Sequence, residues 1–498
     1  MQFAPDIRLP SGLTFTFLSA NAISGAFDNA ASTSLFYVST LTQTGTEVRV
    51  TLAKTGSVGD IAPEGGQRNV ARVLESLPQG VSEGLRNAIA ALGSAQTAGE
   101  ARSILRQLSG ENHGLDPSLG QGGIAGVNTL LATRLARIGR ATAGPGVTLA
   151  ALTQEQTETL NGARGVQPHL GRHLHRGNRL ATLFTTLAPV MGAPMTGSPV
   201  EAVPDEEVQA DALSVGSSRA DLGTGIWLET FRTYGDVEAS AQASGVGYRI
   251  LGTTVGFDSK VSERLVLGGA VSYTKTDTDI VTGLGDGAET RGTHATAYGR
   301  YSFDGFDLLS AFSLTKNETE AMRITRIGGV TQRAASAYEG WSMSANAGVT
   351  TNVSFHGVDI APAVSLAYVH QSTDGFSETG SGALLTVSSR RNDALNLRGV
   401  VRFSRRIDLT TQVAVTPEVR VGGIYDLLNE DASVVARFSG TAATFRTQGA
   451  QTDRGGALLG GGAVFHLQDG LHLYADYDGY YAGNETSHTG LVGARLSF

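Results

Sequence analysis

About twelve stretches in which apolar and polar residues alternate fill the chain from residue 225 to residue 498, and they restrict its fold more than any other feature. Successive side chains of a β-strand point to opposite faces, so this period of two predicts strands with one apolar face and one polar face. Turn-forming residues separate the stretches. We predict strands near 225–234, 246–258, 264–279, 289–303, 306–322, 332–354, 358–371, 389–404, 410–427, 453–467, 471–482 and 487–498.

The later strands show the alternation most clearly. Val419 and Val421 fall on one face, whereas Glu418 and Arg420 fall on the other. An apolar face toward lipid and a charged face toward water is typical of a transmembrane β-barrel. The charged residues that we predict to line a water-filled lumen are Arg398, Arg402, Glu418, Arg420, Asp476 and Asp478.

Strand length and connection length favour a membrane barrel over a soluble sheet. Many strands are long enough to cross a bilayer at a tilt, whereas soluble strands average about five or six residues. The connections at 304–305, 356–357, 405–408 and 468–470 are short, and those near 279–289, 371–388 and 427–453 are long. Alternating short and long connections are the outer-membrane pattern. The barrel must close, because an open edge in lipid leaves backbone groups unpaired.

Three different regions precede the barrel. Residues 1–60 alternate in short stretches, which we interpret as β-helix-like rungs at the end of something longer. Residues 61–116 have helical periodicity, with a capping box at Thr97 and Glu100 and a terminating Gly110. Residues 117–224 form a linker with one amphipathic helix at 124–140, whose polar side carries Arg134 and Arg137. We therefore predict an all-β transmembrane barrel of about 12 antiparallel strands at 225–498, preceded by rungs and a helical linker region.

Composition excludes several kinds of chemistry. The chain has no cysteine, which rules out disulfides and thiolate chemistry, and its net charge of −8 argues against nucleic acid as a partner. No nucleophile elbow, zinc helix or phosphate loop is present, so we expect no catalytic site, cofactor or metal. His169 and His173 have metal-ligand spacing, but Arg172 and Arg176 favour a solvated basic patch.

Four short motifs occur in a fixed order and carry a family resemblance. The helical segment that precedes many autotransporter barrels begins with a motif similar to Gln67-Arg-Asn-Val70-Ala71-Arg-Val-Leu74. It ends with a motif similar to Leu108-Ser-Gly-Glu111-Asn-His113. Gly225-Ile-Trp227 resembles the opening barrel strand. The end of the chain resembles a signal read by the outer-membrane assembly machinery, through Val492, Ala494, Leu496 and Phe498. The chain thus resembles a classical (type V) autotransporter.

The resemblance implies a translocator in the cell outer membrane of a Gram-negative bacterium. Such a barrel exports and anchors its own N-terminal passenger, whose last part is residues 1–60 here. The implied partners are outer-membrane lipid and lipopolysaccharide, the barrel assembly machinery and periplasmic chaperones, and the barrel is expected to be monomeric. The resemblance also implies a helix retained in the pore, for which 124–140 is the candidate; the alternative is that this helix packs outside the barrel, for instance on the helices of 67–110. Within the pore, its arginines are expected to meet Glu418, Asp476 and Asp478.

Three alternatives compete with this interpretation. An open outer-membrane pore would conduct ions, although the long N-terminal region and the candidate pore helix argue against it. An outer-membrane enzyme needs a convergent catalytic group that the sequence does not display. A soluble β-protein is disfavoured by the strand lengths. Residues 180–195 are too short and too broken for a transmembrane helix, and the first ten residues do not resemble a signal peptide, so we expect export to require an upstream segment.

Overall fold

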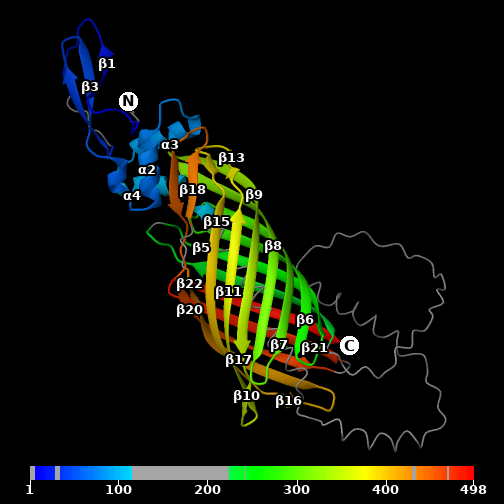
Figure 1. Ribbon diagram of the computed structural model, residues 1–498. Helices are drawn as coiled ribbons and strands as arrows, with labels where there is room; N and C mark the ends of the chain where they lie inside the picture. The colour runs from blue at the N-terminus through cyan, green and yellow to red at the C-terminus, as the bar shows by residue number, and fades with distance from the viewer. Residues whose placement is uncertain (1–5, 28–33, 115–223, 242, 429–432, 468–469) are drawn as a thin grey trace, which may run out of the picture. The chain divides into compact units, whose positions relative to one another are not determined.

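The computed structural model describes residues 6–27, 34–114, 224–241, 243–428, 433–467 and 470–498 (Figure 1). The candidate pore helix at 124–140, with Arg134 and Arg137, and the histidines of 169–175 lie outside these residues. Among the described helices, none is both long enough and apolar enough to cross a membrane.

Twelve long antiparallel strands form the C-terminal part of the chain. They are β4 (Gly225–Val237), β5 (Val246–Lys260), β6 (Leu265–Ile280), β7 (Gly287–Ser302), β8 (Asp307–Ile327), β9 (Val330–Thr350), β11 (Val358–Thr373), β15 (Arg390–Ser404), β17 (Ala414–Asp426), β20 (Gly455–His466), β21 (Leu471–Ala482) and β22 (Glu485–Ser497). Each pairs with the next, and β22 pairs with β4 from Ser497↔Gly225 to Glu485↔Val237, which closes the barrel. The predicted barrel of about 12 strands is confirmed.

The two rims of the barrel differ in their connections. One rim, which we call the terminal rim, holds the start of β4, the end of β22 and the connections 261–264, 303–306, 351–357, 405–413 and 467–470. The short strands β10 (Val353–Phe355) and β16 (Ile407–Asp408) lie in two of these connections. The opposite rim, which we call the loop rim, holds the connections 238–245, 281–286, 328–329, 374–389, 427–454 and 483–484.

Strands β8 and β9 are longer than predicted. The predicted break at 323–331 is wrong, because both strands continue with unbroken pairing to Ile327↔Val330. Gly328 and Gly329 then form the turn, with φ of 58° and 79°. Glycine adopts such left-handed backbone angles without steric cost, so two residues are enough to reverse the chain. Arg323 and Arg326 therefore belong to the paired part of β8 and not to a loop.

The two faces of the barrel follow the alternation in the sequence. Phe312, Leu314 and Val421 are exposed on the outer face, whereas Thr315 and Arg420 are buried on the inner face. Inward glycines stand opposite inward aromatic residues. A Cβ added to Gly252, for example, would lie closer than 3.0 Å to the ring of Phe231. These glycines leave the room that the aromatic rings occupy.

The predicted β-helix-like rungs take a different form. Strands β1 (Leu13–Ser19), β2 (Tyr37–Gln43) and β3 (Glu47–Lys54) pair antiparallel, in the order β1-β3-β2. Rungs of a β-helix would pair in parallel. The turn between β2 and β3 has only three residues, and so short a connection can join antiparallel neighbours only.

Four helices and one 3₁₀ turn follow this sheet: α1 (Val58–Ile61), α2 (Gly66–Ser76), α3 (Glu83–Gly93), α4 (Ala98–Ser109) and η1 (Glu111–Gly114). The Thr97 side chain accepts a hydrogen bond from Glu100 N at 3.2 Å and begins α4. Gly110 ends α4 in the left-handed conformation at φ 67°. We refer to residues 58–114 as the helical segment.

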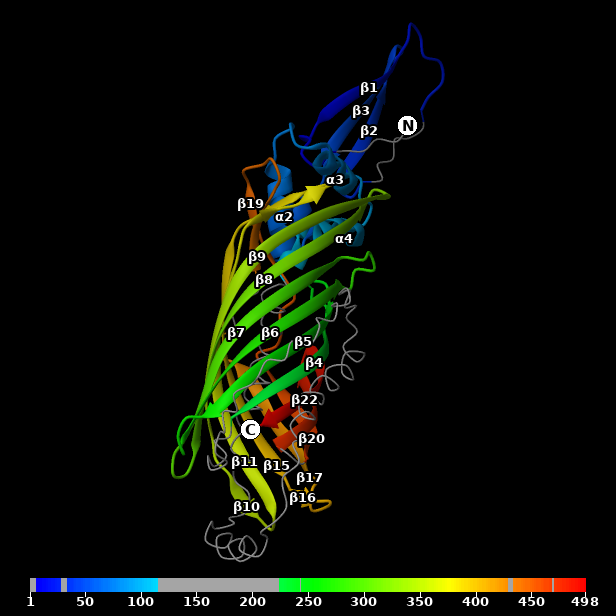
Figure 2. The same ribbon diagram turned by 90° about the vertical axis from the view of Figure 1, so that its right-hand side faces the viewer.

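The two longest connections of the loop rim fold into a sheet that the sequence did not predict. Strands β12 (Phe376–Ser377), β14 (Leu385–Val387), β18 (Ser433–Phe438) and β19 (Thr444–Gln448) pair in that order, and β13 (Thr379–Gly380) pairs with β9. Buried residues of this loop sheet, such as Leu385 and Phe438, share one hydrophobic cluster with Leu74, Leu85 and Leu105 of the helices. Figure 1 shows the helices at the loop rim beside β18, and Figure 2 shows α2 beside β19.

Candidate functional site

The interior of the barrel carries many buried polar side chains on its wall. On β5 to β8, inward hydroxyl groups and His294 form a chain of hydrogen bonds. The His294 ring lies 2.9 Å from Thr274 Oγ1 and 2.8 Å from Thr315 Oγ1. Thr296 and Ser313 pair at 2.8 Å. Such a wall can solvate a polar chain, which an apolar core could not.

A charged network occupies the opposite wall. Arg420 donates to Glu418, to Asp476 at 2.8 Å and to Asp478 at 3.1 Å, and its side chain is only 3% exposed. Added Cβ atoms at Gly460 and Gly462 would lie closer than 3.0 Å to Asp478 and Asp476, so glycine gives these carboxylates their room.

All six residues that we predicted to line the lumen lie on inward positions of β15, β17 and β21. Arg402 stands opposite Arg420, and Arg398 stands opposite Ile424. Their role in a conducting or translocating lumen stays a prediction. Glu418, Asp476 and Asp478 all contact Arg420 already, so an arginine of the candidate pore helix would have to share them.

The seam between β22 and β4 closes the barrel and carries the predicted assembly signal. Val492, Ala494 and Leu496 stand opposite Thr230, Leu228 and Ile226 on the outer face. On the inner face, Arg495 donates to Asp258 at 2.6 Å. Phe498 N donates to Thr224 O at 2.9 Å, while the Phe498 side chain is 64% exposed. The recognition of this end by an assembly machinery stays a prediction.

The loop rim holds a buried cluster of charged residues from three separate regions. Glu378 follows β12, Arg323 lies near the end of β8, and His113 lies in η1. The Glu378 carboxylate accepts from Arg323 Nε at 2.8 Å, from His113 Nε2 at 2.9 Å and from Leu385 N at 2.7 Å. The Glu378 side chain is 0% exposed. Burial raises its pKa, but the charge of Arg323 and the bonds from Arg323 and His113 outweigh burial and hold the pKa well below its usual range.

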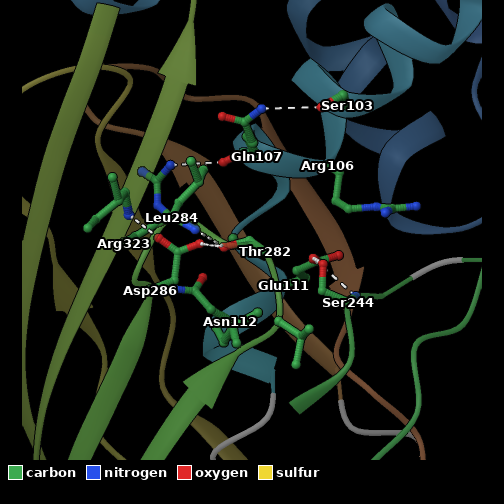
Figure 3. Close-up of a pocket in the computed structure, with 14 residues that line it drawn as sticks. Ser103, Arg106, Gln107, Glu111, Asn112, Ser244, Thr282, Leu284, Asp286 and Arg323 are labelled. Atoms are coloured by element: carbon green, nitrogen blue, oxygen red, sulfur yellow. Dashed lines mark hydrogen bonds between the residues drawn. The ribbon is translucent and has the colours of Figure 1, made fainter. Parts of the chain in front are cut away.

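A second buried carboxyl joins the helical segment to the loop rim. Glu111 accepts from Ser244 Oγ at 2.6 Å and from Ser244 N at 3.2 Å. Burial raises the pKa of Glu111, and the nearby charge of Asp286 adds to this effect. Figure 3 shows Glu111 and Asp286 at a pocket of about 200 Å³ between the helical segment and the barrel.

Only part of this rim was visible in the sequence. The motif from Leu108 to His113 was recognised in the sequence, but it did not indicate that its side chains bond to Glu378 and Ser244. Those partners lie on rim connections whose contacts the alternation of the strands does not specify. Among the described residues, no group of three or more histidines and carboxylates could hold a metal ion.

A closed antiparallel barrel with an apolar outer face and polar groups inside is the architecture of an outer-membrane β-barrel protein. The family model "Autotransporter beta-domain" matches residues 226–478, and the chain belongs to this family. It carries the β-barrel translocator domain of an outer-membrane protein of a Gram-negative bacterium.

Curated relatives come from Rickettsia. "Outer membrane protein B" of Rickettsia japonica is 26% identical over 364 residues, which cover 70% of this chain and 21% of that protein. The protein of the same name from Rickettsia conorii is 24% identical over 363 residues, with the same shares. The chain thus spans about a fifth of the length of these relatives.

Two solved structures of autotransporter domains match part of the chain. The translocator domain of autotransporter NalP from Neisseria meningitidis has a TM-score of 0.45 and 17% identity, covering 65% of this chain and 96% of that one. The beta domain of the Bordetella autotransporter BrkA has a TM-score of 0.41 and 20% identity, covering 55% of this chain and 99% of that one.

Proposed function

We propose that the chain divides at the loop rim into an exported part and a membrane part. Residues 1–60 are the end of the passenger, and residues 61–116, which hold α2 to α4, stay at the outer mouth. Residues 117–224 are a linker that crosses the lumen, and residues 225–498 are the barrel. In this proposal the loop rim faces the cell exterior and the terminal rim faces the periplasm.

The positions of two described residues support this proposal. Gly114 lies at the loop rim, where a Cβ added to it would be 2.7 Å from Gly449 N. Thr224 lies at the terminal rim, where it accepts from Phe498 N. The chain between them therefore connects one rim to the other. An outside route would place charged residues such as Arg134 and Arg137 against lipid, which is costly, whereas the lumen is lined by polar groups.

The proposed partners follow from the surfaces of the barrel. The exposed apolar side chains of the outer face suit lipid and lipopolysaccharide, and the outward residues near Phe498 suit the assembly machinery, with periplasmic chaperones acting before insertion. The barrel closes within one chain, which supports a monomer. We assign no reaction to residues 224–498 and no role with nucleic acid. Hydrolytic activity in the purified barrel would contradict the first of these assignments.

An export assay tests the proposed function. An export signal and an epitope are joined to the N-terminus, and the full chain is compared with one that lacks β22. The epitope is expected on the surface of intact cells only when β22 is present, because the barrel cannot close without it. If the epitope stays in the periplasm although the barrel is folded and heat-modifiable, the proposal is wrong.

A further inference from the structure

We propose that residues 66–114 form a cap that closes the outer mouth of the barrel to small solutes after export. That this mouth faces the cell exterior depends on the proposed function, whereas its closure is argued from the contacts around the rim. This adds a permeability barrier to a translocator, at a place separate from any helix within the lumen.

The contacts of the cap are spread around the rim rather than gathered at one side. Five of the six connections of the loop rim meet it. Ser244 binds Glu111, Asp286 faces Glu111 across the pocket, and Ala91 lies beside Gly328. The two longest connections supply further contacts: Glu378 binds His113, and the Arg446 carbonyl accepts from Asn69 Nδ2 at 2.9 Å. A segment can reach connections on opposite sides of a barrel only by lying across its mouth.

The fit between cap and rim is close. Four glycines of the cap leave no space for a side chain: a Cβ at any of Gly66, Gly84, Gly110 or Gly114 would lie closer than 3.0 Å to atoms of the two longest connections. At Gly84 and Gly114 the obstructing atoms belong to the backbone of Gly382 and Gly449. Contacts this close exclude a layer of water between the two surfaces.

Charge and apolar packing together hold the cap in place. His113 reaches Glu378, which Arg323 already neutralises, so docking does not leave the Glu378 carboxylate buried without a counter-charge. Gln107 lies beside this cluster, where its carbonyl accepts from Arg323 Nη1 at 3.1 Å and its side chain accepts from Arg326 N at 2.6 Å. The hydrophobic cluster shared by the helices and the loop sheet continues outward from these bonds.

The pocket between the cap and the rim is small. The pocket of about 200 Å³ is lined by Glu111, Asp286, Arg323 and their neighbours (Figure 3). Because a water molecule takes about 30 Å³ of liquid, this volume holds roughly seven waters. It is not a passage for hydrated solutes.

Conductance of the refolded full chain in planar bilayers tests the cap. Wild type is compared with Glu378→Gln and with Gly84→Trp, each checked for cap release by protease cleavage within 66–114. The matched control is Gly80→Ala, since Gly80 has no atom within 4 Å of an added Cβ. Removing one partner of a buried ion pair is expected to raise the undocked population by roughly two to four orders of magnitude, and conductance should rise with it.

Each outcome decides the proposal. Low conductance in wild type and in Gly80→Ala, with high conductance in the released variants, supports it. High conductance in wild type overturns it, and so does cap release without a rise in conductance. Gly84→Trp cannot dock without displacing the Gly382 backbone, so release is obtained even if Glu378→Gln stays seated. Surface display of an N-terminal epitope, measured on the same variants, reports separately whether export itself has failed.

Discussion

His113 Nε2 lies 2.9 Å from Glu378 Oε1, although 265 positions separate the two residues in the chain. Both side chains are almost fully buried, at 2% and 0% exposure. One comes from the helical segment and the other from a connection between two barrel strands. Through this contact the loop rim binds the helical segment.

The docking of the helical segment should be weakened more by loss of the buried charge than by loss of one hydrogen bond. Glu378→Gln leaves Arg323 buried without its hydrogen-bonded carboxylate and should destabilise docking by about 3–5 kcal/mol. His113→Ala removes one bond to a group that keeps its other partners and should cost about 1–3 kcal/mol. The measurement is the urea concentration at which protease first cleaves residues 58–114.

An exposed ion pair provides the control for these two variants. Glu64 pairs with Arg68 and is 85% exposed, so Glu64→Gln should cost less than about 1 kcal/mol. Equal effects of Glu64→Gln and Glu378→Gln would contradict the role of the buried cluster.

Docking should weaken as the pH rises, because of Glu111. The pKa of Glu111 is raised above its ordinary value of 4.5 when the segment is docked, so the docked state binds the proton more tightly. The resulting stabilisation is complete below pH 4.5 and is lost as the pH rises through the docked-state pKa. Glu378, whose pKa is lowered, acts in the opposite direction and favours docking only above its ordinary pKa.

Protease protection of the helical segment, measured from pH 5 upward, tests this pH dependence. Protection should fall with rising pH in the wild type and stay level in Glu111→Gln. Asp286 and Arg106 are the other charged groups that act on Glu111, and they are unchanged in this variant. A wild-type profile that is flat over this range would refute the assignment to Glu111.

Arg420 should contribute more to barrel stability than any exposed cation. Arg420→Met leaves Glu418, Asp476 and Asp478 close together and without their shared counter-charge, which should cost about 3–5 kcal/mol. Lys316→Met breaks two exposed pairs on the outer face, which solvent screens, and should cost much less. Urea unfolding followed by tryptophan fluorescence compares them, since Trp227 is buried beside the closing seam. A smaller effect at Arg420 than at Lys316 would contradict the network.

Phe498 should matter for assembly but not for stability. Its side chain is 64% exposed, so Phe498→Ala should change the free energy of unfolding of the refolded barrel by no more than about 0.5 kcal/mol. If it belongs to an assembly signal, the same variant should reach the outer membrane in reduced amount. Phe355, which is 63% exposed on the same rim, is the matched control. Equal amounts of both variants in the outer membrane would remove Phe498 from the signal.

The barrel could be predicted because its information is local. Apolar and polar residues alternate over ten or more residues in each long strand. This alternation can be recognised without knowing which strand pairs with it. Helices α2 to α4 were visible for the same reason, through a period of 3.6 and the cap at Thr97. The ends of β8 and β9 were missed because Arg323 and Arg326 look like loop residues when their contacts with Glu378 and Gln107 are unknown.

The loop rim could not be predicted because its information is distributed. Strands β12, β14, β18 and β19 have two to six residues, too few for a reliable period. The antiparallel pairing of β1 to β3 depends on a three-residue turn, and the alternation alone does not reveal it. The pairing of His113 with Glu378 arises only when the barrel has brought β8 and the connection after β11 together.

Site-specific labelling of intact cells tests the central claim most directly. The chain has no cysteine, so single cysteines can be introduced at Gly45 in the N-terminal sheet and at Glu263 in a turn of the terminal rim. A membrane-impermeant maleimide should label Gly45→Cys in intact cells and should label Glu263→Cys only after the outer membrane is permeabilised. Labelling of Glu263→Cys in intact cells, with Gly45→Cys protected, would contradict the orientation and the export of the N-terminal part.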